Sequence, residues 1–181
     1  MVWKAEELGG RVPEQREIAR FARQIENPMH RALFILAYLT AGRIREVLSL
    51  TREQFKIEKI GVRKVLTIRH MLNEKNRKRH TKTFHIPIDK ERALVNPILS
   101  YLNTKERKER IFPFKTRQRA WQILKQYGIF PHYLRHIRLT HLVTIYGFTD
   151  QVLVRFAGWT DSQPAQYYIE LKAEDILDKM K

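Results

Sequence analysis

Cations, a polar ring and phenols gather in the last third of the sequence. His132 and Arg135 stand three residues apart, Trp159 follows a glycine, and a tyrosine pair comes next at Tyr167 and Tyr168. A cation cluster, a ring N–H and a phenol are the groups needed to attack a phosphodiester without a metal ion. Each pattern is common when it stands alone, so this hypothesis depends on what the rest of the chain supplies.

A further arginine lies in the first third of the chain, after an apolar segment with helical periodicity. The small residues 40–42 break that segment, and Arg43 and Arg45 follow, with Glu46 three residues after Arg43. Such a break lets an arginine at the start of the next helix project into a cleft, and Glu46 could orient it. The alternative is an arginine on the exposed face of an amphipathic helix.

Residues 62–70 and 81–88 alternate apolar and polar side chains, which predicts two half-buried strands. The segment between them is rich in Lys and Arg, so the predicted hairpin has a cationic tip suited to DNA phosphates. For each cation the alternative is a nonspecific phosphate contact. The predicted DNA-binding residues are Arg77, Lys78, Arg79 and Lys82.

Taken in order, these motifs resemble the catalytic block of the tyrosine recombinases, the phage-integrase family, of an archaeal or viral-like type. The resemblance runs from Pro13 to Lys179 and includes the run RHIRLTHLV after His132. It implies an α+β, mainly α fold: a helical catalytic domain with a small antiparallel β-hairpin or sheet at one edge.

The resemblance also implies roles for the cations. Arg43 and Arg135 would clamp the phosphate through bidentate bonds that lysine cannot copy. Arg45 is kept in reserve for Arg43, because Ala41 stands where the family usually has a glycine two residues before its arginine. A hairpin lysine would protonate the departing 5′ oxygen. We prefer Lys75 for this role, with Lys78 and Lys82 as alternatives.

The ring and the phenol receive roles in the same way. His132 would accept the tyrosine proton or hydrogen-bond the phosphate. Trp159 stands where the family most often has His; its N–H donates a hydrogen bond but carries no proton away. The family spacing of nine residues selects Tyr168 over Tyr167 as the nucleophile.

The implied reaction is site-specific cleavage and rejoining of DNA through a 3′-phosphotyrosyl bond, with no cofactor and no metal. Two alternatives remain: a topoisomerase IB-like enzyme that relaxes DNA, and a noncatalytic DNA-binding module with the same fold. Relaxation by a monomer would favour the first. Retention of Arg43, His132, Arg135 and Tyr168 together argues against the second.

Composition agrees with a polyanionic partner. The 181 residues carry 35 Lys and Arg against 19 Asp and Glu, a formal charge of +16, which favours double-stranded DNA as the partner. The resemblance implies a homo-oligomer, dimer or tetramer, on that DNA. The sequence has no cysteine, no H-E-x-x-H pattern and no apolar run of the ~20 residues that a membrane span needs. We therefore expect a cytoplasmic protein, at the nucleoid or, if viral, in the host cytoplasm.

The expected organisation is a flexible lead-in over residues 1–12 and one catalytic domain over residues 13–181, without the amino-terminal DNA-clamping domain of such recombinases. His136 and His141 are expected to be structural. Turn and capping signals predict the helices that position the site. These run over about residues 13–25, 28–40 (buried), 89–102 (capped by Asp89, with Pro97 as a kink or boundary), 117–127, 131–145 and 150–157, then from Ser162 through the tyrosines, with a last amphipathic helix after Tyr168.

Overall fold

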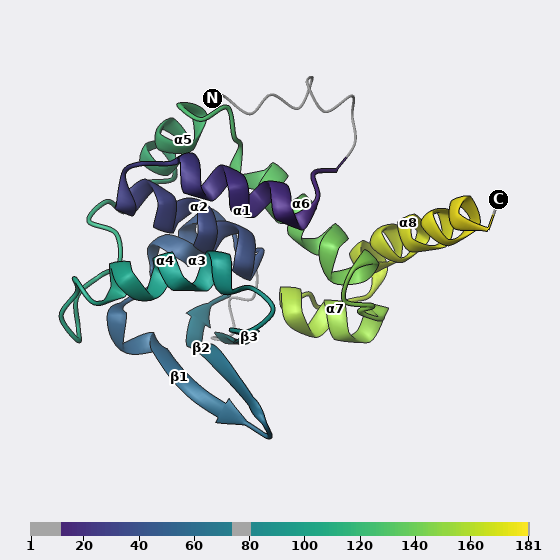
Figure 1. The fold of residues 1–181 in the computed structure, drawn as a ribbon, viewed down its shortest axis with the longest axis horizontal. Helices are drawn as coiled ribbons and strands as arrows, with labels where there is room; N and C mark the ends of the chain where they lie inside the picture. Colours follow the sequence, from purple (N-terminus) through teal and green to yellow (C-terminus); the bar gives the residue numbers. More distant parts are fainter. Residues whose placement is uncertain (1–11, 74–80, 181) are drawn as a thin grey trace.

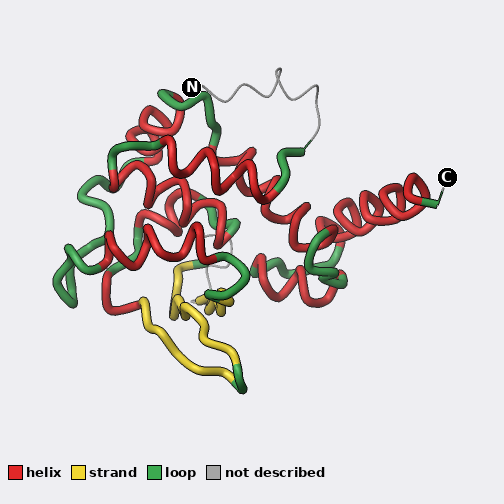
Figure 2. The backbone as a smooth tube through the Cα atoms, viewed as in Figure 1, coloured by secondary structure: helices red, strands yellow, loops and turns green. Residues whose placement is uncertain are grey.

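The computed structural model describes residues 12–73 and 81–180 (Figure 1). Helices make up most of this part, and the strands lie together at one edge (Figure 2). The fold class expected from the sequence is therefore confirmed. The elements in chain order are α1 (Gln15–Gln24), α2 (Pro28–Thr40), α3 (Ile44–Leu48), η2 (Arg52–Gln54), β1 (Phe55–Ile60), β2 (Arg63–Leu72), β3 (Thr81–Pro87), α4 (Arg92–Leu102), α5 (Arg117–Lys125), α6 (Pro131–Thr144), α7 (Asp150–Ala157) and α8 (Gln163–Lys179).

Helix α2 is the centre of the fold, as its nearly continuous apolar sequence predicts. The side chain of Asn27 accepts the backbone N–H of Met29 at 2.9 Å and caps the helix, and Pro28 fits its first turn. Helices α1, α3, α4, α5 and α6 all contact α2. The buried side chains of these helices, of the strands and of the loops between them form one hydrophobic cluster, called here the larger cluster. It runs from Ile18 to Ile137 and includes Phe34, Phe84 and Phe112.

The three strands form an antiparallel sheet in the order β1-β2-β3. The β2–β3 hairpin is confirmed. Strand β1 was not predicted, although Phe55 to Glu58 alternate apolar and polar side chains. In the structure Phe55 is buried, whereas Ile57 and Ile60 are exposed. Between Ile68 and Met71 the β2–β3 register shifts by one residue, and His70 within this bulge has φ +55°. Bulges re-aim the side chains beside them.

A smaller cluster joins the second half of α6 to α7 and α8, at the end of the molecule from which α8 extends (Figure 1). Thr149 caps α7, and Gly158 ends it with φ +68°. A Cβ at Gly158 would lie 2.7 Å from Lys82 and Asn73, so glycine is required there both by conformation and by space. The buried members of the smaller cluster are Ala41, Leu139, Leu142, Val143, Leu153, Ala157 and Ala165.

Two helix boundaries differ from the predictions. Helix α4 begins at Arg92 with Glu91 as its N-cap, not at Asp89, because the backbone turns at residues 89–91 and the Glu91 N–H donates to the Pro87 carbonyl. Pro97 lies inside this helix rather than at its boundary. Helix α8 continues without a break past Tyr168, so the residues that follow it do not form a separate helix.

The described residues hold no helix that is both long and apolar enough to cross a membrane. In the same part of the chain, no group of three or more His, Cys, Asp or Glu side chains is placed to hold a metal ion.

Candidate active site

Arg43 stands at the break between α2 and α3, as predicted. Ala41 ends α2 with φ +47°, the left-handed conformation that a glycine adopts at lower cost. Arg43 is the N-cap of α3, and the Glu46 carboxylate accepts its backbone N–H at 2.8 Å. A second Glu46 oxygen lies 3.5 Å from the Arg43 guanidinium. Glu46 therefore orients Arg43 through both its backbone and its side chain.

Glu46 also holds a buried lysine. Lys82 Nζ lies 2.7 Å from the Glu46 carboxylate, and Lys82 is only 6% exposed. Burial lowers the pKa of Lys82; Glu46 opposes that shift, while Arg135 and Arg43 add to it. The lysine consequently belongs to the same charged group as both arginines.

Arg135 is anchored on α6 and is 8% exposed. Its guanidinium donates to the carbonyl of Ala41, the residue in the left-handed conformation, and lies 5.8 Å from the centre of the Trp159 ring. Burial lowers the pKa of Arg135, and the neighbouring Arg43 lowers it further. Because the two guanidinium groups repel each other, an anion bound between them would be favoured.

Trp159 and Tyr168 are also neighbours of Arg135. Their rings stack with centroids 6.3 Å apart and an interplanar angle of 18°. Burial raises the pKa of Tyr168, and Arg135 opposes that shift. Tyr167, the alternative nucleophile, is 52% exposed. Of the two tyrosines, Tyr168 is therefore the one beside the cations.

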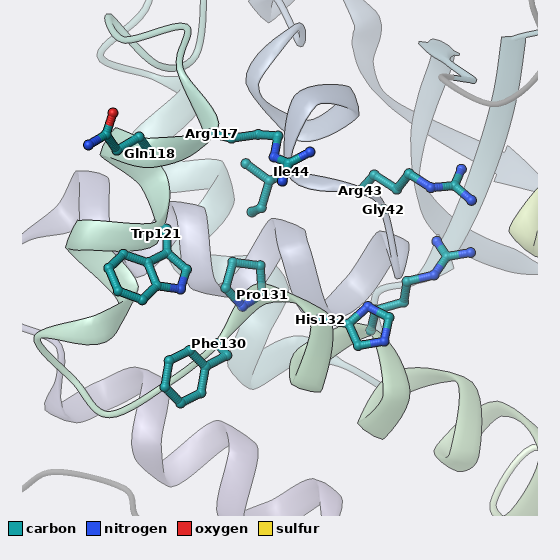
Figure 3. A pocket seen from close by; sticks show the side chains of 10 residues that line it. Gly42, Arg43, Ile44, Arg117, Gln118, Trp121, Phe130, Pro131 and His132 are labelled. Atoms are coloured by element: carbon teal, nitrogen blue, oxygen red, sulfur yellow. The ribbon is translucent and has the colours of Figure 1, made fainter.

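His132 is exposed and lines an open cleft together with Arg43 and Arg135. Figure 3 shows Arg43 and His132 on one side of this cleft and an aromatic pair, Trp121 and Phe130, on the other. The cleft thus has a cationic end with Arg43 and His132 and an aromatic end along α5, where Arg117 and Gln118 also line it.

The other two histidines of α6 differ from each other. His141 is buried; it donates to the Pro13 carbonyl at 2.6 Å and its Nδ1 accepts the Tyr38 hydroxyl at 2.7 Å, as a structural residue would. His136 lies beside the proposed nucleophile instead, with Nδ1 3.5 Å from the Tyr168 hydroxyl. Sequence reasoning treated the two alike because it had no measure of which face of α6 meets α8.

The hairpin predictions separate into two groups. Lys75, Arg77, Lys78 and Arg79 lie outside the described residues. Lys82 is on β3, with its side chain on the buried face beside Phe84 and Ile86. The alternation of TKTFHIPI already placed Lys82 on that face, a signal that sequence reasoning left unused when it grouped Lys82 with the hairpin tip.

This arrangement can clamp an anion between the arginines, with a phenol and a lysine nearby, which are the requirements for transfer of a phosphoryl group to a tyrosine. The parts come from α3, β3, α6, the segment after α7, and α8.

Comparison with known proteins places these features in context. The model of the phage integrase family matches residues 13–175. The tyrosine recombinase XerD of Haemophilus influenzae is 28% identical over 165 residues, covering 81% of this chain and 51% of that protein. The chain therefore spans about half the length of this curated relative.

Among solved structures, the XerA recombinase aligns with a TM-score of 0.66 at 13% identity, over 94% of this chain and 63% of that one. A XerH site-specific recombinase, solved in a post-cleavage complex with a palindromic difH substrate, aligns with a TM-score of 0.63 at 15% identity, over 99% of this chain and 52% of that one. At such identities the likeness establishes the fold alone.

Proposed function

Because this chain belongs to the phage integrase family, we propose that it is a DNA strand transferase that cleaves and rejoins DNA through a 3′-phosphotyrosyl bond during site-specific recombination or integration. The observation that carries this proposal is the position of Tyr168, stacked on Trp159 beside a buried Arg135 that shares its cleft with Arg43. Tyr168 packs on Trp159 of its own chain rather than pointing away from it, which supports attack in cis.

In the proposed reaction Arg43 and Arg135 bind the nonbridging oxygens of the scissile phosphate. The double negative charge of the phosphorane that develops there is greater than that of the diester, so fixed cations stabilise the transition state more than the ground state. His132, exposed on the cationic side of the same cleft, hydrogen-bonds the phosphate. Trp159 contributes its N–H and supports the ring of Tyr168.

Tyr168 Oη attacks phosphorus and the bond to the 5′ oxygen breaks, which leaves a 3′-phosphotyrosyl ester and a free 5′ hydroxyl. The leaving oxygen needs a proton, and Lys82 is the described lysine that reaches the cluster. Its lowered pKa, caused first by burial, makes it a better acid than an exposed lysine. Lys75 remains the alternative donor. Attack by the 5′ hydroxyl on the ester reverses each step and rejoins the strand.

The proposed substrate is double-stranded DNA, which matches the charge of +16. Two structures of a XerH site-specific recombinase, one before and one after cleavage, are bound to a difH substrate, which supports a substrate of this kind. Recombination exchanges strands between duplexes, so a dimer or tetramer on DNA is part of the proposal. The proposal also places the protein in the cytoplasm, where bacterial, archaeal and many viral genomes are accessible.

The decisive test is capture of the covalent intermediate. A nicked duplex that loses its 5′-hydroxyl fragment after cleavage prevents rejoining, and the adduct is resolved on a denaturing gel. We expect an adduct with the parent chain and with Tyr167→Phe, and none with Tyr168→Phe.

An adduct that persists in Tyr168→Phe would assign the nucleophile to another tyrosine. Salt-sensitive DNA binding with no adduct on any duplex tested would favour a noncatalytic DNA-binding module. Relaxation of supercoiled DNA by the monomer, without strand exchange, would favour a topoisomerase-like activity.

A further inference from the structure

The proposed nucleophile is enclosed by two rings. On one side Tyr168 stacks on Trp159; on the other its ring centroid is 5.6 Å from that of His136, and its hydroxyl is 3.5 Å from His136 Nδ1. The indole has an N–H donor and no acceptor, whereas a neutral imidazole has one of each. Of these two neighbours, only His136 offers an acceptor for the phenolic proton.

The groups that face His136 favour its neutral form. Tyr167 and Tyr168 approach it from α8, with ring centroids 6.0 and 5.6 Å away, and His132 lies one turn earlier on α6. Burial lowers the pKa of His136, and His132 lowers it further. At neutral pH the imidazole is therefore uncharged, and its Nδ1 is free of a proton when Nε2 carries it.

The tyrosine needs such an acceptor. Its pKa is raised by burial, so the hydroxyl keeps its proton until attack. His132, the base that motif reasoning suggested, is exposed and lines the cleft beside the arginines, where the phosphate would bind. His132 therefore lies with the arginines of the proposed phosphate site, whereas His136 lies at the Tyr168 hydroxyl.

We propose that His136 positions the hydroxyl of Tyr168 and accepts its proton as the oxygen attacks phosphorus. The inference rests on the proposed function and adds to it the identity of the base. The proton moves from Tyr168 Oη to His136 Nδ1, which leaves an imidazolium beside the new phosphotyrosyl ester. When the strand is rejoined, the same proton returns to the departing phenolate, so no external acid or base is consumed.

The 3.5 Å separation belongs to the DNA-free protein, and catalytic hydrogen bonds shorten when the substrate is bound. His136 and Tyr168 sit on helices that pack against each other. Neither arginine belongs to α8, so a shift of α8 toward α6 would shorten this contact without moving them.

The test measures the rate of single-turnover adduct formation on the nicked duplex between about pH 5.5 and 9.5. A general base contributes roughly 100-fold or more to such a rate. We expect His136→Ala to slow the adduct by about 100-fold at pH 7, with an unchanged DNA Kd. In the parent the rate rises as His136 loses its proton and then levels off. In the variant that plateau is lost, and the rate keeps rising with pH as hydroxide takes over.

His136→Asn separates positioning from proton transfer, because the amide keeps a hydrogen-bonding group near Nδ1 but cannot take the proton. We expect a slow rate for it with the same rising pH profile as His136→Ala. Recovery of the parental rate in His136→Asn would reduce His136 to a positioning residue and overturn its role as base.

A parental rate and plateau in His136→Ala would overturn the inference entirely, provided that Tyr168→Phe forms no adduct in the same assay. Failure of the parent chain to form any adduct would instead overturn the proposed function and this inference with it. Thermal melting of both His136 variants shows that any loss of rate occurs in folded protein.

Discussion

Arg43, Glu46 and Lys82 are attached to the larger cluster, whereas Trp159 and Tyr168 are attached to the smaller one. The larger cluster draws on α1 to α6 and the sheet, and its ion pair is almost completely buried. The smaller cluster is built from a few side chains of α6 to α8, and several of its members are half-exposed aromatics. The stability of a structural element depends on the apolar area that it buries. The difference teaches that Arg43, Glu46 and Lys82 are held rigidly, whereas the nucleophile is carried by a part that opens more readily.

The largest expected effect concerns the joint between the two regions. Arg138, 3% exposed, donates to both carboxylate oxygens of Glu91 at the point where α6 passes from the larger cluster to the smaller one. Glu91→Gln leaves this cation without its counter-charge, so we expect a loss of about 3 kcal/mol or more in the free energy of unfolding. Urea denaturation measures it.

The matched control is Glu109→Gln, which removes the same charge from a partly exposed pair with Lys105. Its urea midpoint should stay at the parental value. Equal midpoints for the two variants would mean that Arg138 finds another partner and that the joint does not depend on this pair.

Arg135→Ala tests the clamp. We expect cleavage to slow by about 100- to 1000-fold while DNA affinity stays nearly unchanged, because one preorganised donor to the transition state is lost. Single-turnover adduct formation and a binding titration measure the two quantities. Arg45→Ala, at an exposed position of α3, is the control and should cleave at the parental rate. Full activity in Arg135→Ala would contradict the proposed mechanism.

Truncation in each cluster compares the two regions directly. Leu33 and Leu153 are both fully buried, the first in the larger cluster and the second in the smaller. Leu153→Ala should cost about 2 kcal/mol, the low end for such a change, because a small cluster collapses into the space. Hydrogen exchange should accelerate within residues 150–170 and not in α2.

Leu33→Ala should instead accelerate exchange in α2 and the elements around it, and lower the midpoint of the whole transition. Adduct formation should fall in Leu153→Ala, because Tyr168 is held in place less often. Uniform acceleration across the chain in both variants would show that the two clusters unfold as one unit.

A gain in stability is expected from Ala41→Gly. Ala41 has φ +47°, a conformation that costs an alanine about 1 kcal/mol more than a glycine. Ala37→Gly, within α2, provides the control and should destabilise by about 1 kcal/mol. The Ala41 carbonyl accepts a hydrogen bond from Arg135. If the alanine is needed to hold that carbonyl in position, Ala41→Gly will slow cleavage even though it stabilises the fold. Urea denaturation and the adduct assay distinguish these effects.

The smallest effect is a dependence of stability on pH. Burial lowers the pKa of His141 from its ordinary 6.5, and Arg138 lowers it further, while the Pro13 carbonyl opposes them. The unfolded chain therefore binds more protons than the folded one below that ordinary value, and stability falls as the pH drops from about 7.5 to 5.5. His30 and His136 shift in the same direction. A melting temperature that rose on acidification would contradict this assignment.

The sequence predicted the parts of the fold whose signals are local. Asn27-Pro28, the apolar run of α2 and the cap at Thr116 all mark elements that the structure contains. Strand β1 was missed because its alternation of apolar and polar residues is short and is interrupted by the consecutive polar residues Glu58 and Lys59. The start of α4 was misplaced because Glu91, at its N-cap position, pairs its side chain with Arg138, a residue of α6, instead of bonding to the helix. No local pattern reports a partner 47 positions away.

The site follows the same division. The types and order of Arg43, Arg135, Trp159 and Tyr168 were readable from the sequence, because each lies in a short motif. The pairing of Lys82 with Glu46 and the approach of His136 to Tyr168 depend on how β3 meets α3 and how α8 meets α6. These contacts are set by tertiary packing, so a single sequence leaves several lysines and histidines equivalent.

The order in which the chain is synthesised gives the two-cluster arrangement a further meaning. Every buried member of the larger cluster precedes Leu139, whereas Tyr168 lies beyond it. A ribosome therefore delivers the complete phosphate clamp before it delivers the nucleophile. A chain that ended shortly after Gly147 would still encode both arginines and His132 but not Tyr168. We expect such a chain, if it folds, to bind DNA without cutting it, which a binding titration beside the adduct assay checks.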